Sequence, residues 1–441
     1  MARSRLLAVL AFLCSFLVIA APAAQAAPTT DPADAAAGWL AGRLTDGSHF
    51  VQDFGDAGVF PDQGLTLDAV LAFAAAGSGG TNATAGMAWL AQGTTLVDYV
   101  GDGTTFSDIG ALAKVAYAAE VTGGDGHSVA GIDVLGRLSA QLTASGRFSN
   151  VPAEADNSNA FGQALAQLAL ARTPDGVPAA AVTFLAGSQC PGGGFPLDYG
   201  QATCVPDPDA TAMVVQALAL PGGNAAAAGR GLDWLVSRQA ADGSLDGSGP
   251  TEGVQNANST GLAAEAFRAG GRTGPADAAV GWLRSQQLGC TGPVAQQGAI
   301  AYDGTGFDPG NADRATAQAI LGLSGIGLAD LSLDGATPDA PTLDCAGSPP
   351  PTATPTAIPT SSAPSTPAPS TVAPTHRPTA APTTPVAPVL PVTPPPTEPA
   401  AAVGSLPNTG APVLPVVWTG VGLVLVGVLA VVAGRRRREA P

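Results

Sequence analysis

An apolar pair, in most copies tryptophan followed by leucine, returns along the chain at a nearly constant interval. Successive clear copies are 50, 95, 50 and 48 residues apart, and they are Trp39-Leu40, Trp89-Leu90, Phe184-Leu185, Trp234-Leu235 and Trp282-Leu283. A weaker copy, Val134-Leu135, lies within the long gap. Fixed periods of this length are typical of repeated helical units. The pattern therefore predicts six units of about 48 residues.

Each unit is predicted to hold two helices joined by a glycine turn. The turn carries an apolar residue, as at 47–50, 146–148, 193–195 and 243–245. The second helix is rich in Ala and Leu at three- and four-residue spacing, and Leu65 to Ala75 opens this series. Helix-capping residues are expected at its start, at Asp108, Asn159, Asp209, Asn258 and Asp313. No segment shows β-alternation, so we predict an all-α fold.

Six helix pairs can be stacked as an open solenoid or closed into a ring. An open array needs polar units at its two ends. The first and last units here are no more polar than the middle ones. We therefore expect a closed α/α toroid over residues 27–346, with the Ala-rich helices inside and the Trp-Leu helices outside.

The best repeats resemble a known family. Residues 184–195 (FLAGSQCPGGGF) and 234–245 (WLVSRQAADGSL) are similar to the prenyltransferase/squalene-cyclase-type repeat of terpenoid cyclase-like α/α toroids, and Trp282 to Gln286 matches its first half. The resemblance covers roughly residues 30–330 and implies the toroid fold. It does not fix the reaction, because such toroids serve as isoprenoid cyclases, prenyltransferase subunits, cobalamin carriers and thioester domains.

One segment is similar to the catalytic motif of class II terpenoid cyclases. In Asp207-Pro208-Asp209-Ala210 the resemblance implies that Asp209 is a general acid, with a pKa raised by burial, and that Asp207 accompanies it. The last Asp of the family pattern is replaced by Ala210. The domain is also poor in the aromatic residues that stabilise carbocations. The alternative that we favour from the sequence is that Asp209 only caps its helix.

The sequence lacks the residue patterns that metal-dependent and thioester chemistry require. His49 and His127 lack cysteine or acidic partners at zinc-ligand spacing, so no metal site and no cofactor are expected. An internal thioester needs Cys and Gln three residues apart, and Cys290 lacks that glutamine.

In a closed ring the inner helices run parallel, so their N-termini meet at one mouth. Asp108, Asp209 and Asp313 are expected there, which predicts an acidic mouth. The mouth is expected either to bind a cationic or sugar-like ligand, or calcium, or to be a capped rim without a ligand.

Four cysteines lie between residues 27 and 346, and an even number outside the cell favours disulfides. Three connectivities are possible. We predict Cys190–Cys204 and Cys290–Cys345.

The beginning of the chain has the three parts of a secretory signal peptide, which we assign to residues 1–26. Arg3 and Arg5 precede an apolar run, and a small-x-small sequence ends at Ala26. Secretion places the toroid outside the cell, where the predicted disulfides are stable.

The end of the chain resembles the sorting signal of Gram-positive surface proteins. Leu406-Pro407-Asn408-Thr409-Gly410 is followed by an apolar stretch over 411–434 that is long enough to cross a bilayer, and by a basic tail over 435–441. The resemblance implies that a sortase attacks the Thr409 carbonyl and joins Thr409 to peptidoglycan.

Residues 347–405 form a linker between the toroid and this signal. The linker contains 18 prolines, 12 threonines and no aromatic residue, so it has no core to bury. An extended polyproline II conformation suits a spacer that crosses the cell wall.

The net charge of −16 argues against nucleic-acid binding, which requires a basic surface. Two classes of function remain. The first is a wall-anchored protein whose toroid displays a binding site for an unknown ligand or partner, and the sequence favours this class. The second is a surface enzyme of the terpenoid-cyclase-like type with Asp209 as the acid.

Overall fold

The computed structural model describes residues 26–55, 58–153 and 156–346. The predicted linker, sorting motif, apolar segment and basic tail, and the predicted signal peptide up to residue 25, lie outside the described residues. Within the described ranges, no helix combines the length and the apolar character that a membrane span needs.

The described residues form thirteen α-helices and one short hairpin. Six helices that are almost wholly buried form an inner layer: α2 (Gln63–Ala76), α5 (Ile109–Val121), α7 (Ala160–Leu170), α9 (Pro208–Ala219), α11 (Ala257–Ala269) and α13 (Ala312–Ser324). Six helices flank them: α1 (Pro32–Ala41), α3 (Gly80–Leu90), α6 (Val134–Ala140), α8 (Ala179–Gly187), α10 (Ala225–Arg238) and α12 (Thr273–Gln286). The thirteenth, α4 (Thr95–Val100), lies in the connection from α3 to α5.

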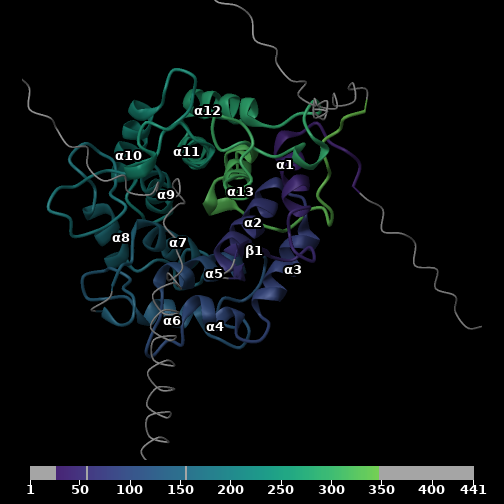
Figure 1. Ribbon diagram of the computed structural model, residues 1–441. Helices are drawn as coiled ribbons and strands as arrows, with labels where there is room; N and C mark the ends of the chain where they lie inside the picture. The colour runs from purple at the N-terminus through teal and green to yellow at the C-terminus, as the bar shows by residue number, and fades with distance from the viewer. Residues whose placement is uncertain (1–25, 56–57, 154–155, 347–441) are drawn as a thin grey trace, which may run out of the picture. The chain divides into compact units, whose positions relative to one another are not determined.

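The inner helices form a closed ring. Each packs against the next along the chain, and α13 packs against α2, which closes the circle. Figure 1 shows α13 beside α2 and α1, although they come from opposite ends of the domain. The Ala-rich helices lie inside, and the Trp-Leu pairs lie on the outer helices with their leucines buried. The prediction of an all-α toroid of six helix pairs is confirmed.

A repeated glutamine explains why the pair spacing is constant. Gln189, Gln239 and Gln287 each donate to the carbonyl of their own turn glycine and to a carbonyl of the next outer helix. For Gln287 the next outer helix is α1, where the acceptor is the Pro32 carbonyl at 2.9 Å. The same contact thus joins the sixth unit to the first. The repeat places this role at Gln287, one residue beyond the Gln286 that the sequence suggested.

A second repeated contact fixes the apolar residue of each turn. A side chain near the start of the inner helix accepts its backbone N–H, in the pairs Phe50–Thr66, Phe148–Gln163, Phe195–Thr211, Leu245–Thr260 and Ile300–Thr316. These five turn side chains are at most 2% exposed. The turns therefore belong to the core between the two layers.

Two of the five predicted helix caps are confirmed and three are wrong. Asp108 and Asn159 cap α5 and α7. Helices α9, α11 and α13 begin two residues earlier than predicted, because their N-caps are Asp207, Asn256 and Asn311. Consequently Asp209, Asn258 and Asp313 lie in the first helical turn and are free for other roles.

The expectation of no β-structure is wrong at one place. Strands β1 (Phe50–Asp53) and β2 (Val59–Asp62) pair antiparallel between the first glycine turn and α2. Seven of the eight strand residues are at least partly exposed. Since neither face is consistently buried, the hairpin shows no alternation that a sequence pattern could reveal.

Both predicted disulfides are present. Cys190–Cys204 and Cys290–Cys345 each have a Cα–Cα distance of 5.5 Å. The second holds the C-terminal segment of the domain, which pairs with the N-terminal one through the backbone of Thr29. The first and last described residues of the chain therefore lie on the same side of the ring.

Candidate functional site

Contacts between consecutive inner helices join their N-terminal ends. Ser248, before α11, donates to Asp207 at the start of α9. The amide of Ala257, the first residue of α11, donates to the carbonyl of Tyr302, which precedes α13. Arg314, in the first turn of α13, bonds to Asp68 of α2 at 3.0 Å. We call this end of the ring the N-terminal mouth.

Asp207 is a firmly held carboxylate at the mouth. As the N-cap of α9 it accepts from the amide of Ala210 at 2.6 Å, and its other oxygen accepts from the Ser248 hydroxyl. Pro208 at the first helical position suits this cap, since it has no N–H to satisfy. Burial raises the pKa of Asp207, and these donors oppose the rise. Within the pair, Asp207 is the member whose two carboxyl oxygens are both held by donors of the protein.

Asp209 has the opposite environment. Its side chain is buried, with 9% exposure, and its Oδ1 atom has no hydrogen-bond partner among the described residues. Burial first, and then the charge of Asp207, raise the pKa of Asp209 to about 8, while the Ser259 hydroxyl opposes the rise. With a pKa of about 8, Asp209 is mostly protonated at neutral pH beside a second carboxyl group, which is the arrangement of a general acid.

The groups around this pair are polar. Asp246 lies close enough for its charge to act on Asp209, and it is itself held by Arg238 at 3.0 Å. Burial, followed by the charge of Asp209, raises the pKa of Tyr302 to about 12. Asn258 occupies on α11 the position that Asp209 occupies on α9, is 5% exposed, and has an Oδ1 atom without a partner among the described residues.

The structure places Asp108, Asp209 and Asp313 at the N-terminal ends of α5, α9 and α13 but does not bring them together. Burial raises the pKa of Asp108 to about 6, and its carboxylate caps α5. Asp313 is paired with Arg43 of α1 at 2.8 Å. No group of three or more His, Cys, Asp or Glu in the described ranges is arranged to hold a metal ion, so calcium is not indicated.

The histidines and cysteines in the described ranges have structural partners. His49 stacks on Trp89 with ring centroids 4.4 Å apart. His127 contacts Asp133 at 2.8 Å on the surface. Cys290 is bonded to Cys345 and is therefore unavailable for a thioester.

Sequence reasoning missed two ionisable groups inside the ring. Lys114, the single lysine of the chain, lies 2.7 Å from Asp68, whose other oxygen binds Arg314, so one network joins α5, α2 and α13. Glu265 of α11 is fully buried, and neither of its carboxylate oxygens has a hydrogen-bond partner among the described residues. Burial raises the pKa of Glu265 to about 8, with Gln216 opposing the rise. The only sequence signal for Glu265 was that it is a single glutamate within an Ala-rich helix.

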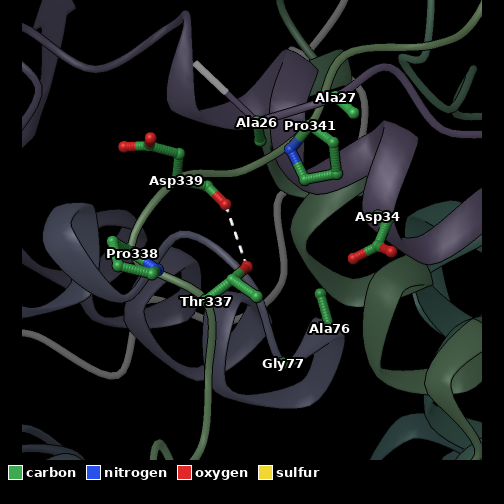
Figure 2. Close-up of a pocket in the computed structure, with 9 residues that line it drawn as sticks. All are labelled: Ala26, Ala27, Asp34, Ala76, Gly77, Thr337, Pro338, Asp339 and Pro341. Carbon is green, nitrogen blue, oxygen red and sulfur yellow. Dashed lines mark hydrogen bonds between the residues drawn. The ribbon is translucent and has the colours of Figure 1, made fainter. Parts of the chain in front are cut away.

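Two surface hollows have been located in the described part. One, of about 820 Å³, is open and lies near the mouth, lined by Asp242, Gly253, Trp282, Asp303 and their neighbours. Its Gly253 amide donates to Asp246, which places it next to the acid pair. The other, of about 480 Å³, lies where residues 337–341 pass α1 and α2, and Figure 2 shows its lining of mostly Ala, Gly and Pro residues. None of the predicted site residues line the second hollow.

No protein-family model and no curated protein sequence matches the chain. Among solved structures, a protein from Actinoplanes is similar at 19% identity with a TM-score of 0.49, covering 67% of this chain and 98% of that one. The type II terpene cyclase MstE from Scytonema is similar at 16% identity and a TM-score of 0.45, covering 66% and 96%. The unsaturated glucuronyl hydrolase from Bacillus sp. GL1 is similar at 12% identity and a TM-score of 0.48, covering 67% and 95%. The assignment of the fold rests on the helix packing described above.

Proposed function

We propose that the toroid is an acid catalyst in which Asp209 donates a proton to an uncharged substrate. The observation that carries this proposal is the buried Asp209 carboxyl beside the anchored Asp207: burial raises its pKa to about 8, and its Oδ1 atom has no partner among the described residues. Strongly shifted carboxyls of this kind are concentrated at catalytic sites. The enzyme alternative is therefore better supported than display of a binding site alone. After transfer, Asp209 is a carboxylate and the substrate carries the positive charge. Water then adds to the substrate, and the proton that this water releases restores the Asp209 carboxyl.

Asp209→Asn is expected to lower turnover by about a hundredfold or more, because the amide keeps the shape but has no acidic proton. Two probes are suitable: geranylgeraniol, which the repeat resemblance implies, and chitotetraose, which suits the polar surroundings. Wild-type turnover of the accepted probe should fall as the pH rises through about 8, where Asp209 ionises. Asp277→Asn, a change on an exposed carboxylate of α12, is the control and should have no effect. Undiminished turnover by Asp209→Asn would contradict the proposal.

We also propose that the chain is attached to the bacterial cell wall by a sortase. The support is the order of Leu406-Pro407-Asn408-Thr409-Gly410, an apolar segment and four arginines. In this proposal the sortase cleaves after Thr409 and joins its carbonyl to peptidoglycan. The linker then carries the toroid away from the anchor, with Cys345 as the last covalent attachment before it.

Thr409→Ala is expected to remove covalent wall attachment, because the sortase acts at the Thr409 carbonyl. The measurement is the amount of protein that remains in boiled, detergent-washed walls of the host and is released by a wall hydrolase. Asn408→Ala, at the variable position of the motif, should stay attached. If Thr409→Ala protein is recovered in the wall as fully as wild type, the sorting proposal is wrong.

A further inference from the structure

The mouth contains two buried side-chain oxygens without a protein partner. Asp209 and Asn258 are each the second residue of adjacent inner helices, α9 and α11. Their exposures are 9% and 5%, and the Oδ1 atom of each lacks a hydrogen-bond partner among the described residues. The repeat thus places the same kind of free polar atom at equivalent points on two neighbouring helices.

Buried polar atoms that lack a partner are costly, at about 1–3 kcal/mol each. A hydrocarbon substrate would leave that cost in place, since it has no hydrogen-bonding group. The neighbouring side chains are polar as well, because Ser248, Ser259 and Tyr302 contribute hydroxyls near the pair. The mouth is therefore matched to a molecule that brings its own hydrogen-bond donors.

The same polarity continues deeper in the ring. Tyr117 of α5 and Gln216 of α9 both bond to the backbone of Leu328, although α7 separates these helices, so both side chains face the centre. Burial and then the charge of Glu265 raise the pKa of Tyr117. Glu265, on α11, therefore also lies near this centre. Among the described residues, the Oε1 atom of Gln318 is also buried without a partner, while Gln216 and Glu265 lie close enough to interact with each other. The side chains around the centre of the ring are therefore polar, and two of them bond to the Leu328 backbone.

Charge narrows the class of ligand further. The chain has a net charge of −16, and Asp207 and Asp246 both lie close enough for their charges to act on Asp209. An anionic ligand would be repelled. An uncharged ligand with several hydroxyls can donate to Asn258 and reach the Asp209 proton without that penalty.

We infer that the toroid binds an uncharged, hydroxyl-rich substrate, a neutral glycan chain, with Asn258 accepting one of its hydroxyls. The inference rests on the proposed function of Asp209, since it names the substrate of that site. It departs from the isoprenoid that the repeat resemblance implies. Asn258 is a binding residue here, and Asp209 is the proton donor to an oxygen of the glycan.

The test is calorimetric titration of the protein with chitotetraose and with cellotetraose, at millimolar concentrations, with geranylgeraniol, which has a single hydroxyl on an isoprenoid chain, as the comparison. At least one tetrasaccharide should bind. Asn258→Leu, which keeps the side-chain size, should weaken binding about tenfold, as expected for one lost hydrogen bond. Thr183→Val, on the exposed surface of α8, is the control and should bind as wild type does. A melting curve checks that Asn258→Leu is folded, and Asn258→Ala serves if it is not.

The outcomes separate this inference from the proposal on which it rests. Asp209→Asn should bind the tetrasaccharide normally but not convert it. This result would support both the glycan inference and the proposed role of Asp209. If neither tetrasaccharide binds, or if the Asn258 variants bind equally well, the inference is overturned. If geranylgeraniol is then converted by wild type and not by Asp209→Asn, the proposed function stands while the glycan is wrong.

Discussion

Replacing Gly298 with valine is expected to lower the free energy of unfolding by about 4 kcal/mol. Gly298 lies in the turn after the sixth outer helix, with φ at +94°, a conformation that a β-branched residue avoids. A Cβ atom there would lie 2.6 Å from the Ala35 carbonyl oxygen of α1. Both effects act at the contact that joins the last unit to the first. Urea unfolding followed by circular dichroism measures the change.

Two other glycines separate the causes. Gly306→Val has φ at +106° but no neighbouring atom within 4 Å, so it reports backbone strain without the clash. Gly304→Val has neither the left-handed conformation nor a near neighbour, and it should leave stability almost unchanged. If Gly298→Val is no more destabilised than Gly306→Val, then α1 does not pack against this turn and the ring is not closed there.

Glu265→Gln is expected to raise the free energy of unfolding at pH 7 by about 3 kcal/mol. The Glu265 pKa is about 8 in the folded protein and near its ordinary value of 4.5 in the unfolded chain. At pH 7 the unfolded chain has therefore released a proton that the folded protein keeps, which favours unfolding. Glutamine resembles the protonated form and removes this difference.

The same variant changes the pH dependence of stability. In wild type, Glu265 lowers the free energy of unfolding by about 1.4 kcal/mol for each unit that the pH rises between about 4.5 and 8. Below pH 4.5 Glu265 is protonated in both states and causes no such loss. Glu265→Gln should reduce this slope, leaving the part that Asp108, Asp207 and Asp209 contribute. Glu252→Gln, at an exposed position, is the control and should keep the wild-type slope. An unaltered slope in Glu265→Gln would show that Glu265 is ionised in the folded protein.

The repeat made the toroid predictable because its residues act locally. Gln189 and Gln239 each make the same two hydrogen bonds at the same spacing, so the unit is visible without the structure. The closed ring followed from the absence of polar end units, and the contact of Gln287 with Pro32 confirms it.

The helix starts were predicted two residues late where the sequence has two possible capping residues separated by one position. Asp207 and Asp209 are both able to cap a helix. Pro208, between them, favours Asp207 as the cap, because proline suits the first helical position. That shift changes the role of Asp209 from a cap to a buried acid. A local pattern does not distinguish the two, because the difference depends on what covers the helix end.

Glu265 and Lys114 were not predicted because their environment is made by distant parts of the chain. Lys114 meets Asp68, 46 residues away, and Arg314 completes the group from the last unit. Glu265 is buried only once the ring closes around it. The sequence shows such residues as single charges in apolar helices, without showing which face each helix turns inward.

The protonation of Asp209 is the claim on which the catalytic account depends. Carbon-13 NMR of the aspartate carboxyl groups measures it directly, with Asp209→Asn identifying the resonance. The account predicts that the Asp209 carboxyl is still protonated at pH 7 and titrates near pH 8. A midpoint near 4, the value of an ordinary aspartate, would show that Asp209 is an anion at neutral pH and has no proton to give.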